Sequence, residues 1–162
     1  MDILIFVTLG TQDKPFPRLL EKIEEQIKKG NIKEEVIVQA GYTKFESKYM
    51  KILGMIPMEE YNEYMKKCDL LITHGGVGSI FDALKLGKKI IGCPRLKKYG
   101  EHLNDHQIQL IESFHEKGYL LAYNEEDDLA EILKKVKKMK PIKYKSNNQK
   151  MLDIITNFIE NN

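Results

Sequence analysis

The sequence predicts an α/β fold in which a parallel β-sheet carries helices on both of its faces. Short apolar runs of strand length alternate with longer amphipathic segments along nearly the whole chain. Parallel strands need crossover connections, and right-handed crossovers place helices on both faces of a sheet. A chain of 162 residues can bury a substantial core, so we expect one domain over residues 1–162.

The apolar runs give the strands in order. The first, Ile3–Thr8, is followed by shorter runs, and Leu70–Thr73 is apolar enough to be buried on both faces. The segment near Lys51–Ile56 is a weaker extended piece. The expected strands are Ile3–Thr8, Glu35–Gln39, Lys51–Ile56, Leu70–Thr73, Lys89–Gly92 and Tyr119–Ala122.

Helical periodicity fills the intervals between these strands. In Phe16–Lys29 the residues Leu19, Leu20, Ile23 and Ile27 fall on one face, and Ser79 opens a second apolar-periodic segment. The expected helices are Phe16–Lys29, Met58–Lys67, Ser79–Leu86, Asn104–Lys117, Asp127–Lys138 and a final one over about 146–159.

Composition excludes several classes of protein. A hydrophobic content of 42% and a charged content of 31% are those of an ordinary globular protein. The net charge of +2 gives no argument for nucleic-acid binding. Cys68 and Cys93 each flank an apolar run, so we expect buried free thiols in a reducing cytoplasm rather than a disulfide or a metal pair.

We expect neither a signal peptide nor a spanning helix at the amino terminus. The apolar run in Met1–Val7 lacks a basic flank and is far shorter than the ~20 residues of a spanning helix. A lysine-rich stretch, residues 134–145, has two interpretations. It is either a solvated helix face with a linker, or a contact for anionic lipid or an acidic partner.

The ligand site is expected where the parallel strands end, because α/β sheets bind ligands outside the carboxyl ends of their strands. The loops there are Leu9–Pro15, Ala40–Phe45, His74–Gly78 and Pro94–Leu103. In His74–Ser79 a glycine-rich turn leads from a strand into a helix. Unpaired amides and the helix dipole favour anions at such a point, so we expect a phosphorylated ligand, most plausibly a nucleotide.

The glycine pattern excludes two common phosphate-binding motifs. No Gly-Lys-Ser/Thr follows Gly75–Gly78, so the turn is not a Walker loop. The pattern also lacks the third glycine of Gly-x-Gly-x-x-Gly, and the loop after the first strand holds Gly10 alone. Both observations argue against a nicotinamide cofactor.

Several polar residues have a structural explanation beside a functional one. Ser79 and Asp82 have nearly the spacing of a capping box, and His74 is either a loop histidine or a charge-assisted phosphate donor. The polar segment from Pro94 to Gln107 also has two interpretations. Either Asn104 or Asp105 caps the next helix, or the polar side chains of the segment converge on a sugar. Two histidines without a second cluster of ligands do not indicate a metal site.

Taken together, the motifs resemble the carboxyl-terminal, donor-binding domain of GT-B glycosyltransferases of family 28. The likeness is carried, in order, by Val7–Gln12, Gln39–Gly41, His74–Ser79, Pro94-Arg95 and Gly100–Gln107. Within that family the chain looks most like the single-domain members. These are the catalytic subunit of the eukaryotic two-part UDP-GlcNAc transferase and its bacterial counterparts in capsule and exopolysaccharide synthesis. The implied fold is a Rossmann-like half of a GT-B enzyme.

The resemblance also implies roles for individual residues. Gly10, Thr11 and Gln12 would face the donor diphosphate, His74 and Ser79 would touch its phosphates, and Asp82 would hold the ribose. His106 and Gln107 would face the sugar, while Arg95 and Glu101 fit the family pattern without an assigned contact. The catalytic residue stays unknown, with His74 and His102 as weak candidates. The UDP-sugar site implied in this way comprises Gly10, Thr11, Gln12, His74, Gly75, Gly76, Gly78, Ser79, Asp82, Arg95, Glu101, His106 and Gln107.

The implied activity is an inverting transfer of a hexose from a UDP-sugar to a lipid-linked saccharide, without a cofactor or metal. The family places the acceptor site and the general base largely in an amino-terminal domain. The resemblance therefore implies a membrane-anchored partner subunit that holds this cytoplasmic chain at the inner face of the membrane, and the chain is a possible homo-oligomer without that partner. Two other functions remain open: a non-catalytic nucleotide-sugar-binding accessory protein, and a small nucleotide-binding regulator.

Overall fold

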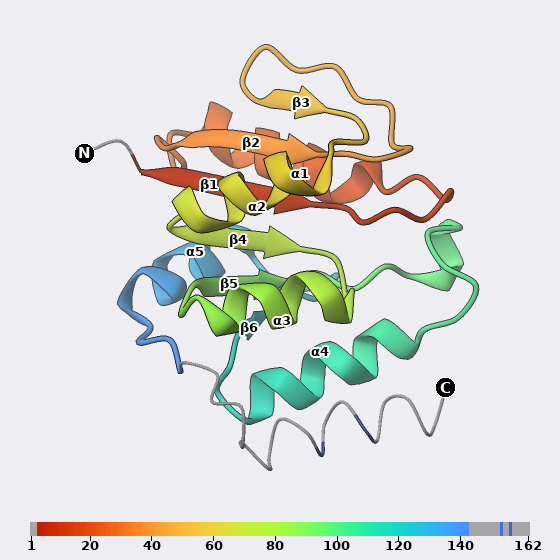
Figure 1. The fold of residues 1–162 in the computed structure, drawn as a ribbon, viewed down its shortest axis with the longest axis vertical. Helices are drawn as coiled ribbons and strands as arrows, with labels where there is room; N and C mark the ends of the chain where they lie inside the picture. The colour runs from red at the N-terminus through yellow and green to blue at the C-terminus, as the bar shows by residue number, and fades with distance from the viewer. Residues whose placement is uncertain (1–2, 143–152, 154–155, 157–162) are drawn as a thin grey trace.

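A six-stranded sheet forms the centre of the computed structural model, which describes residues 3–142, 153 and 156 (Figure 1). The strand order is β3-β2-β1-β4-β5-β6, and each neighbouring pair is parallel. The predicted parallel α/β architecture is therefore confirmed. The strands are β1 (Leu4–Thr8), β2 (Glu35–Gln39), β3 (Lys51–Leu53), β4 (Leu70–Thr73), β5 (Lys89–Gly92) and β6 (Leu121–Ala122).

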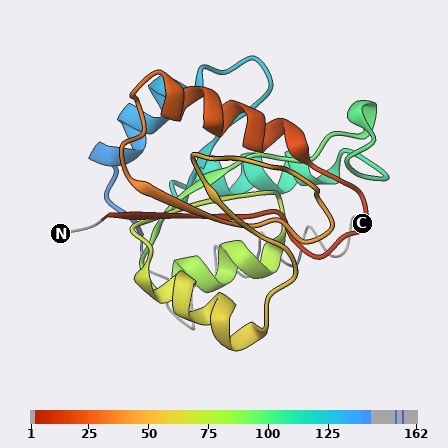
Figure 2. The ribbon, with the colours of Figure 1, turned by 90° about the horizontal axis from the view of Figure 1, so that it is seen from above.

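Helices cover both faces of this sheet, with α1 and α5 on one side and α2 and α3 on the other (Figure 2). Alternation along β1 explains the two layers: Ile5 and Val7 join the core under α1 and α5, whereas Leu4 and Phe6 join the core under α2, α3 and α4. The helices are α1 (Pro17–Lys28), α2 (Met58–Lys67), α3 (Val77–Lys85), α4 (His106–Glu116) and α5 (Leu129–Lys138), with a 3₁₀ turn η1 (Lys97–Tyr99).

Element bounds agree with the sequence expectations to within two residues, except at the end of one strand. The extended piece expected to Ile56 ends at Leu53, and the last strand begins at Leu121. The helix α3 begins at Val77, before Ser79. The helix expected over about 146–159 and the end of the lysine-rich stretch lie outside the described residues.

Burial also settles the expectation for the thiols. Cys68 and Cys93 are both free and buried, as predicted. Burial raises the pKa of Cys68 to about 11 and that of Cys93 to about 12, so both thiols stay protonated at neutral pH. Within the part of the chain that the structure describes, no helix has the length and apolar character needed to cross a membrane.

The chain changes direction across the sheet between β1 and β4. From β1 the chain builds outward through β2 and β3, then returns to add β4 beside β1 and continues outward to β6. At the carboxyl ends of this central pair the Thr8 and Thr73 hydroxyls lie 2.6 Å apart and share a hydrogen bond. The loops after β1 and β4 diverge there, and such a switch point is where an open α/β sheet binds its ligand.

Candidate functional site at the carboxyl edge of the sheet

A cavity of about 350 Å³ opens at the switch point, between the loop after β1, the loop after β3 and the amino end of α3. The size is that of a small-molecule site. Eight residues of the predicted UDP-sugar site are in its wall: Gly10, Thr11, Gln12, His74, Gly76, Gly78, Ser79 and Asp82.

The amino end of α3 faces this cavity without a side-chain cap. The N-cap residue is Gly76, which has no side chain to offer, and Ser79 lies in the first helical turn. The capping-box interpretation of Ser79 and Asp82 is therefore wrong, because the helix starts too early for Ser79 to cap it. The Ser79 hydroxyl instead accepts a hydrogen bond of 2.9 Å from the Tyr61 hydroxyl. The open helix end leaves backbone donors and the positive end of the dipole for an anion.

The His74 ring sits between the two glycine turns. A Cβ at Gly10 would lie 2.6 Å from His74 Nε2, and one at Gly76 would clash with the same ring, so both loops need glycine there. Burial, and then the nearby charge of Arg95, lower the pKa of His74 to about 3. The ring is therefore neutral at physiological pH, and the charge in a hydrogen bond from His74 to phosphate would come from the phosphate.

The first loop is held in shape by Gln39, at the end of β2. Its side-chain amide donates to the Gly10 carbonyl oxygen over 3.0 Å and accepts from the Gly10 N–H over 3.2 Å. Gly10 has a φ of +83°, which glycine adopts without strain. Gln39 lines the cavity but was not predicted as a site residue, although it begins the Gln39–Gly41 motif.

Arg95 and Glu101 lie behind the first loop and outside the cavity lining. The Arg95 guanidinium is 1% exposed and donates to the carbonyl oxygens of Leu9, Lys14 and Glu101. Glu101 accepts two hydrogen bonds of 3.0 Å from Arg18. Because these bonds connect the loop after β5 to the loop after β1, the pair is placed to hold the cavity wall in position.

The remaining predicted residues differ in their distance from the cavity. His102 contacts Gln12 across the two loops, with 3.2 Å between His102 Nε2 and the amide nitrogen of Gln12. His106 begins α4, where Asn104 Oδ1 accepts from its backbone N–H. Gln107 is 5% exposed and lies behind His74, while Gly75 packs against Gln107. Neither His106, Gln107 nor Gly75 is in the cavity wall.

Part of the cavity wall is apolar and was not predicted. Met55 and Met58 are 49% and 68% exposed, although methionine side chains are usually buried. Met55 and Ile56 come from the β3–α2 connection, and Met58 and Tyr61 from the first turn of α2. The cavity lining thus combines polar groups of His74 and α3 with the two exposed methionines. An exposed Met-x-x-Met after a weak strand is the sequence signal that could have indicated this wall.

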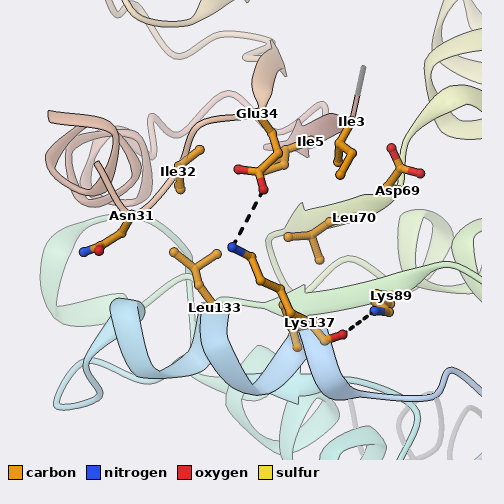
Figure 3. Close-up of a pocket in the computed structure, with 11 residues that line it drawn as sticks. Ile3, Ile5, Asn31, Ile32, Glu34, Asp69, Leu70, Lys89, Leu133 and Lys137 are labelled. Atoms are coloured by element: carbon orange, nitrogen blue, oxygen red, sulfur yellow. Dashed lines mark hydrogen bonds and ion pairs between the residues drawn. The ribbon is translucent and has the colours of Figure 1, made fainter. Parts of the chain in front are cut away.

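A larger cavity lies at the opposite, amino-terminal edge of the sheet (Figure 3). It measures about 530 Å³ and is walled mainly by aliphatic side chains of the strand starts and α5. Its lysine side chains have protein partners. Lys137 Nζ lies 3.8 Å from a Glu34 carboxylate oxygen, and Lys89 Nζ donates to the Lys137 backbone carbonyl oxygen over 2.8 Å. In the described part of the chain, no group of three or more metal-ligating side chains is found at either edge.

These features define a class of protein. A 3-2-1-4-5-6 parallel sheet with an anion-type cavity at its switch point is a Rossmann-like domain, of the kind that forms the carboxyl-terminal half of GT-B glycosyltransferases. The chain belongs to glycosyltransferase family 28, since the model of the family's C-terminal domain matches residues 4–160.

Individual relatives agree with this assignment. A UDP-N-acetylglucosamine–N-acetylmuramyl-(pentapeptide) pyrophosphoryl-undecaprenol N-acetylglucosamine transferase of Clostridium tetani is 30% identical over 159 residues, which cover 85% of this chain. The chain spans only 41% of that relative's length. The UDP-N-acetylglucosamine transferase subunit ALG13 of Yarrowia lipolytica is 26% identical over 145 residues, covering 78% of this chain and 68% of the subunit.

Solved structures show the same fold. The solution structure of ALG13 superimposes with a TM-score of 0.62 at 21% identity and covers 98% of both chains. The crystal structure of MurG from Acinetobacter baumannii gives a TM-score of 0.55 at 15% identity, covering 85% of this chain and 41% of that one. The likeness therefore extends over nearly all of the ALG13 chain and over about two fifths of the MurG chain.

Proposed function

We propose that this chain binds a UDP-sugar in the carboxyl-edge cavity and catalyses transfer of the sugar to a lipid-linked saccharide. The observation that carries the proposal is the uncapped amino end of α3 beside His74 and the Gly10 turn, at the switch point of the sheet. Backbone amides there face the cavity together with a neutral imidazole, which is a set of donors suited to a diphosphate.

The polar and apolar lining residues of the cavity suit the two chemically different parts of UDP. The α3 amides, His74 and the Gly10–Gln12 loop would take the diphosphate. Met55 and Met58 would pack against the flat face of the uracil base. Asp82 also lines the cavity, and its carboxylate would accept hydrogen bonds from the ribose hydroxyls.

The transfer itself requires stabilisation of the leaving UDP. Negative charge develops on the β-phosphate as the bond to the sugar breaks, and donors already oriented toward that position lower the barrier. The proposed donors are protein groups, so we expect turnover without a metal, and a chelator should leave it unchanged. An inverting transfer also needs a general base for the acceptor hydroxyl.

We propose that a membrane-anchored partner subunit supplies this base and the acceptor, and holds the chain at the cytoplasmic face of the membrane. The names of the relatives support this part: the relative from Yarrowia lipolytica is a transferase subunit, and the one from Clostridium tetani is named for a pyrophosphoryl-undecaprenol acceptor. Those names specify UDP-N-acetylglucosamine as donor. We propose that this chain uses a UDP-hexose for a bacterial surface polysaccharide, with UDP-N-acetylglucosamine and UDP-galactose as the first donors to compare.

Calorimetric titration tests the donor site directly. The purified chain should bind UDP, and the UDP-hexoses, but not NAD. The His74→Ala variant should bind UDP about tenfold more weakly, because it loses one hydrogen bond to a charged group. The Lys137→Gln variant at the opposite edge is the matched control and should bind UDP normally. Binding of NAD, or equal UDP affinity for His74→Ala and the parent chain, would contradict the proposal.

A further inference from the structure

Gln107 makes contacts that fix the orientation of its own amide group. The side chain lies in the first turn of α4 and is 5% exposed. Its Oε1 accepts one hydrogen bond from the Gly75 N–H over 3.2 Å and another from the Arg95 N–H over 3.0 Å. Backbone N–H groups can only donate, so the oxygen, and not the amide nitrogen, must face these two loops.

The same orientation determines which atom of the Gln107 amide faces the His74 ring. With the oxygen engaged, the amide nitrogen of Gln107 is left facing His74 Nδ1, 3.5 Å away. An NH₂ group is a donor without acceptor capacity, so Nδ1 must carry the lone pair. A neutral imidazole has a single N–H, which then belongs on Nε2. Burial keeps the ring neutral, since it lowers the pKa of His74 to about 3.

The nitrogen that holds this proton is the one that faces the two glycine turns. A Cβ at Gly10 or at Gly76 would lie 2.6 Å from Nε2, so the missing side chains leave access to it. Among the described residues no protein group accepts a hydrogen bond from Nε2, although His74 lines the cavity. The ring thus has one nitrogen occupied by Gln107 and one left for a ligand.

We propose that Gln107 is a positioning residue, which holds His74 in the Nε2–H tautomer so that its proton points toward the diphosphate site. The consequence for the ligand rests on the proposed function, whereas the tautomer is a property of the free chain. In the other tautomer a lone pair on Nε2 would face the phosphate oxygens and repel them. The inference also accounts for Gly75, where a Cβ would lie 2.5 Å from Gln107 Cβ and push the side chain away.

This role differs from the one that the family resemblance implies, in which Gln107 faces the donor sugar. A sugar contact would affect the affinity for UDP-hexoses and leave the affinity for UDP alone unchanged. A tautomer-setting contact would affect both, because the diphosphate is common to both ligands. The two roles therefore predict different results for the same variants.

The tautomer is measured on the ¹⁵N-labelled free chain by long-range proton–nitrogen correlation NMR spectra. The His74 signals are those that disappear in the His74→Gln variant. In the parent chain we expect a proton on Nε2 alone. Gln107→Glu replaces the donor by a carboxylate oxygen and should place a proton on Nδ1. Gln107→Met removes both contacts at similar length and should give a mixture of the two tautomers. The exposed Gln109→Glu, with the same charge change on the same helix, should leave the spectrum of His74 unchanged.

Calorimetry with UDP completes the test. Gln107→Glu should bind UDP about ten- to a hundredfold more weakly. Gln107→Met should bind it only about twofold more weakly, because roughly half of its molecules keep the Nε2–H tautomer. Gln109→Glu should bind UDP as the parent chain does. A folded Gln107→Met or Gln107→Glu that keeps the pure Nε2–H tautomer would overturn the inference, as would a shift of tautomer with unchanged UDP affinity. If the parent chain shows the expected tautomer but binds no UDP, the proposed function fails and the Gln107–His74 contact stands.

Discussion

The two edges of the sheet carry cavities with opposite chemistry. The amino-edge cavity is the larger, at about 530 Å³ against 350 Å³, yet its charged rim is closed by the Glu34–Lys137 pair. The carboxyl-edge cavity has an uncapped helix end and a histidine nitrogen without a protein acceptor among the described residues. Size alone favours the amino edge as a ligand site, whereas hydrogen-bonding groups without protein partners favour the carboxyl edge, where we propose the donor site.

The contrast has a cause in the topology. At the amino edge, the turns that lead into the strands are short and their polar groups bond locally, as Asn31 does with Gln26 over 2.7 Å. At the carboxyl edge, the loops after β1 and β4 diverge, and long-range contacts must hold them. The buried Arg95–Glu101 pair with Arg18 supplies those contacts. Four predictions test how far the two edges differ.

The largest effect is expected from removing Glu101. In Glu101→Gln, Arg18 loses its ion pair, and the buried Arg95 loses the nearby negative charge of Glu101, which opposes the lowering of the Arg95 pKa by burial. Leaving a buried charge uncompensated costs about 3 kcal/mol or more in the free energy of unfolding. Urea unfolding at pH 7 measures this loss, and a variant within 1 kcal/mol of the parent would show that the pair does not hold the loop.

The next effect compares two glycines with nearly the same backbone conformation, one at each edge. Gly10 has φ +83° and faces His74, whereas Gly30 has φ +81° and open space around it. Both Gly→Ala changes carry the left-handed strain of about 1 kcal/mol. Only Gly10→Ala should also displace the His74 ring, and it should weaken UDP binding by about tenfold, as His74→Ala does, because the same hydrogen bond is lost. Equal UDP affinities in the two variants would remove the assigned role of the first loop.

The comparison also shows what the sequence could predict. The strand bounds of β1, β2, β4 and β5 follow from local apolar runs, and the placement of the site follows from the parallel order. The roles of Arg95 and Gln107 depend on partners more than 10 residues away, which no local pattern reveals. The start of α3 at Val77 was missed because Ser79 resembles a cap, while the glycine turn had already begun the helix. The apolar wall at Met55 escaped notice because exposed methionines carry no motif.

Acid should affect the carboxyl edge selectively. The folded-state pKa of His74, about 3, lies below the unfolded value near 6.5, so the unfolded chain binds the proton first. His74 therefore costs no stability above pH 7, and the chain loses stability as the pH falls below 6.5. The loss between pH 7 and pH 5 should be about 2 kcal/mol from this ring. Urea unfolding across that range should show a flatter profile for His74→Gln, and parallel profiles would contradict the burial of a neutral ring.

The smallest effect belongs to the charged rim of the amino edge. Lys137 is 62% exposed in its side chain and lies 3.8 Å from Glu34, a geometry in which solvent screens most of the attraction. Glu34→Gln should change the free energy of unfolding by less than about 0.5 kcal/mol and leave the UDP affinity unchanged.

Glu101→Gln at the other edge is the matched variant, to be measured by the same urea unfolding and the same UDP titration. If Glu34→Gln weakened UDP binding, the two edges would be coupled through the sheet, and the larger cavity would have to be reconsidered as part of the site. If Glu34→Gln keeps the UDP affinity and Glu101→Gln greatly lowers the free energy of unfolding, ion pairs contribute in this protein only where they hold a loop that the sheet does not fix.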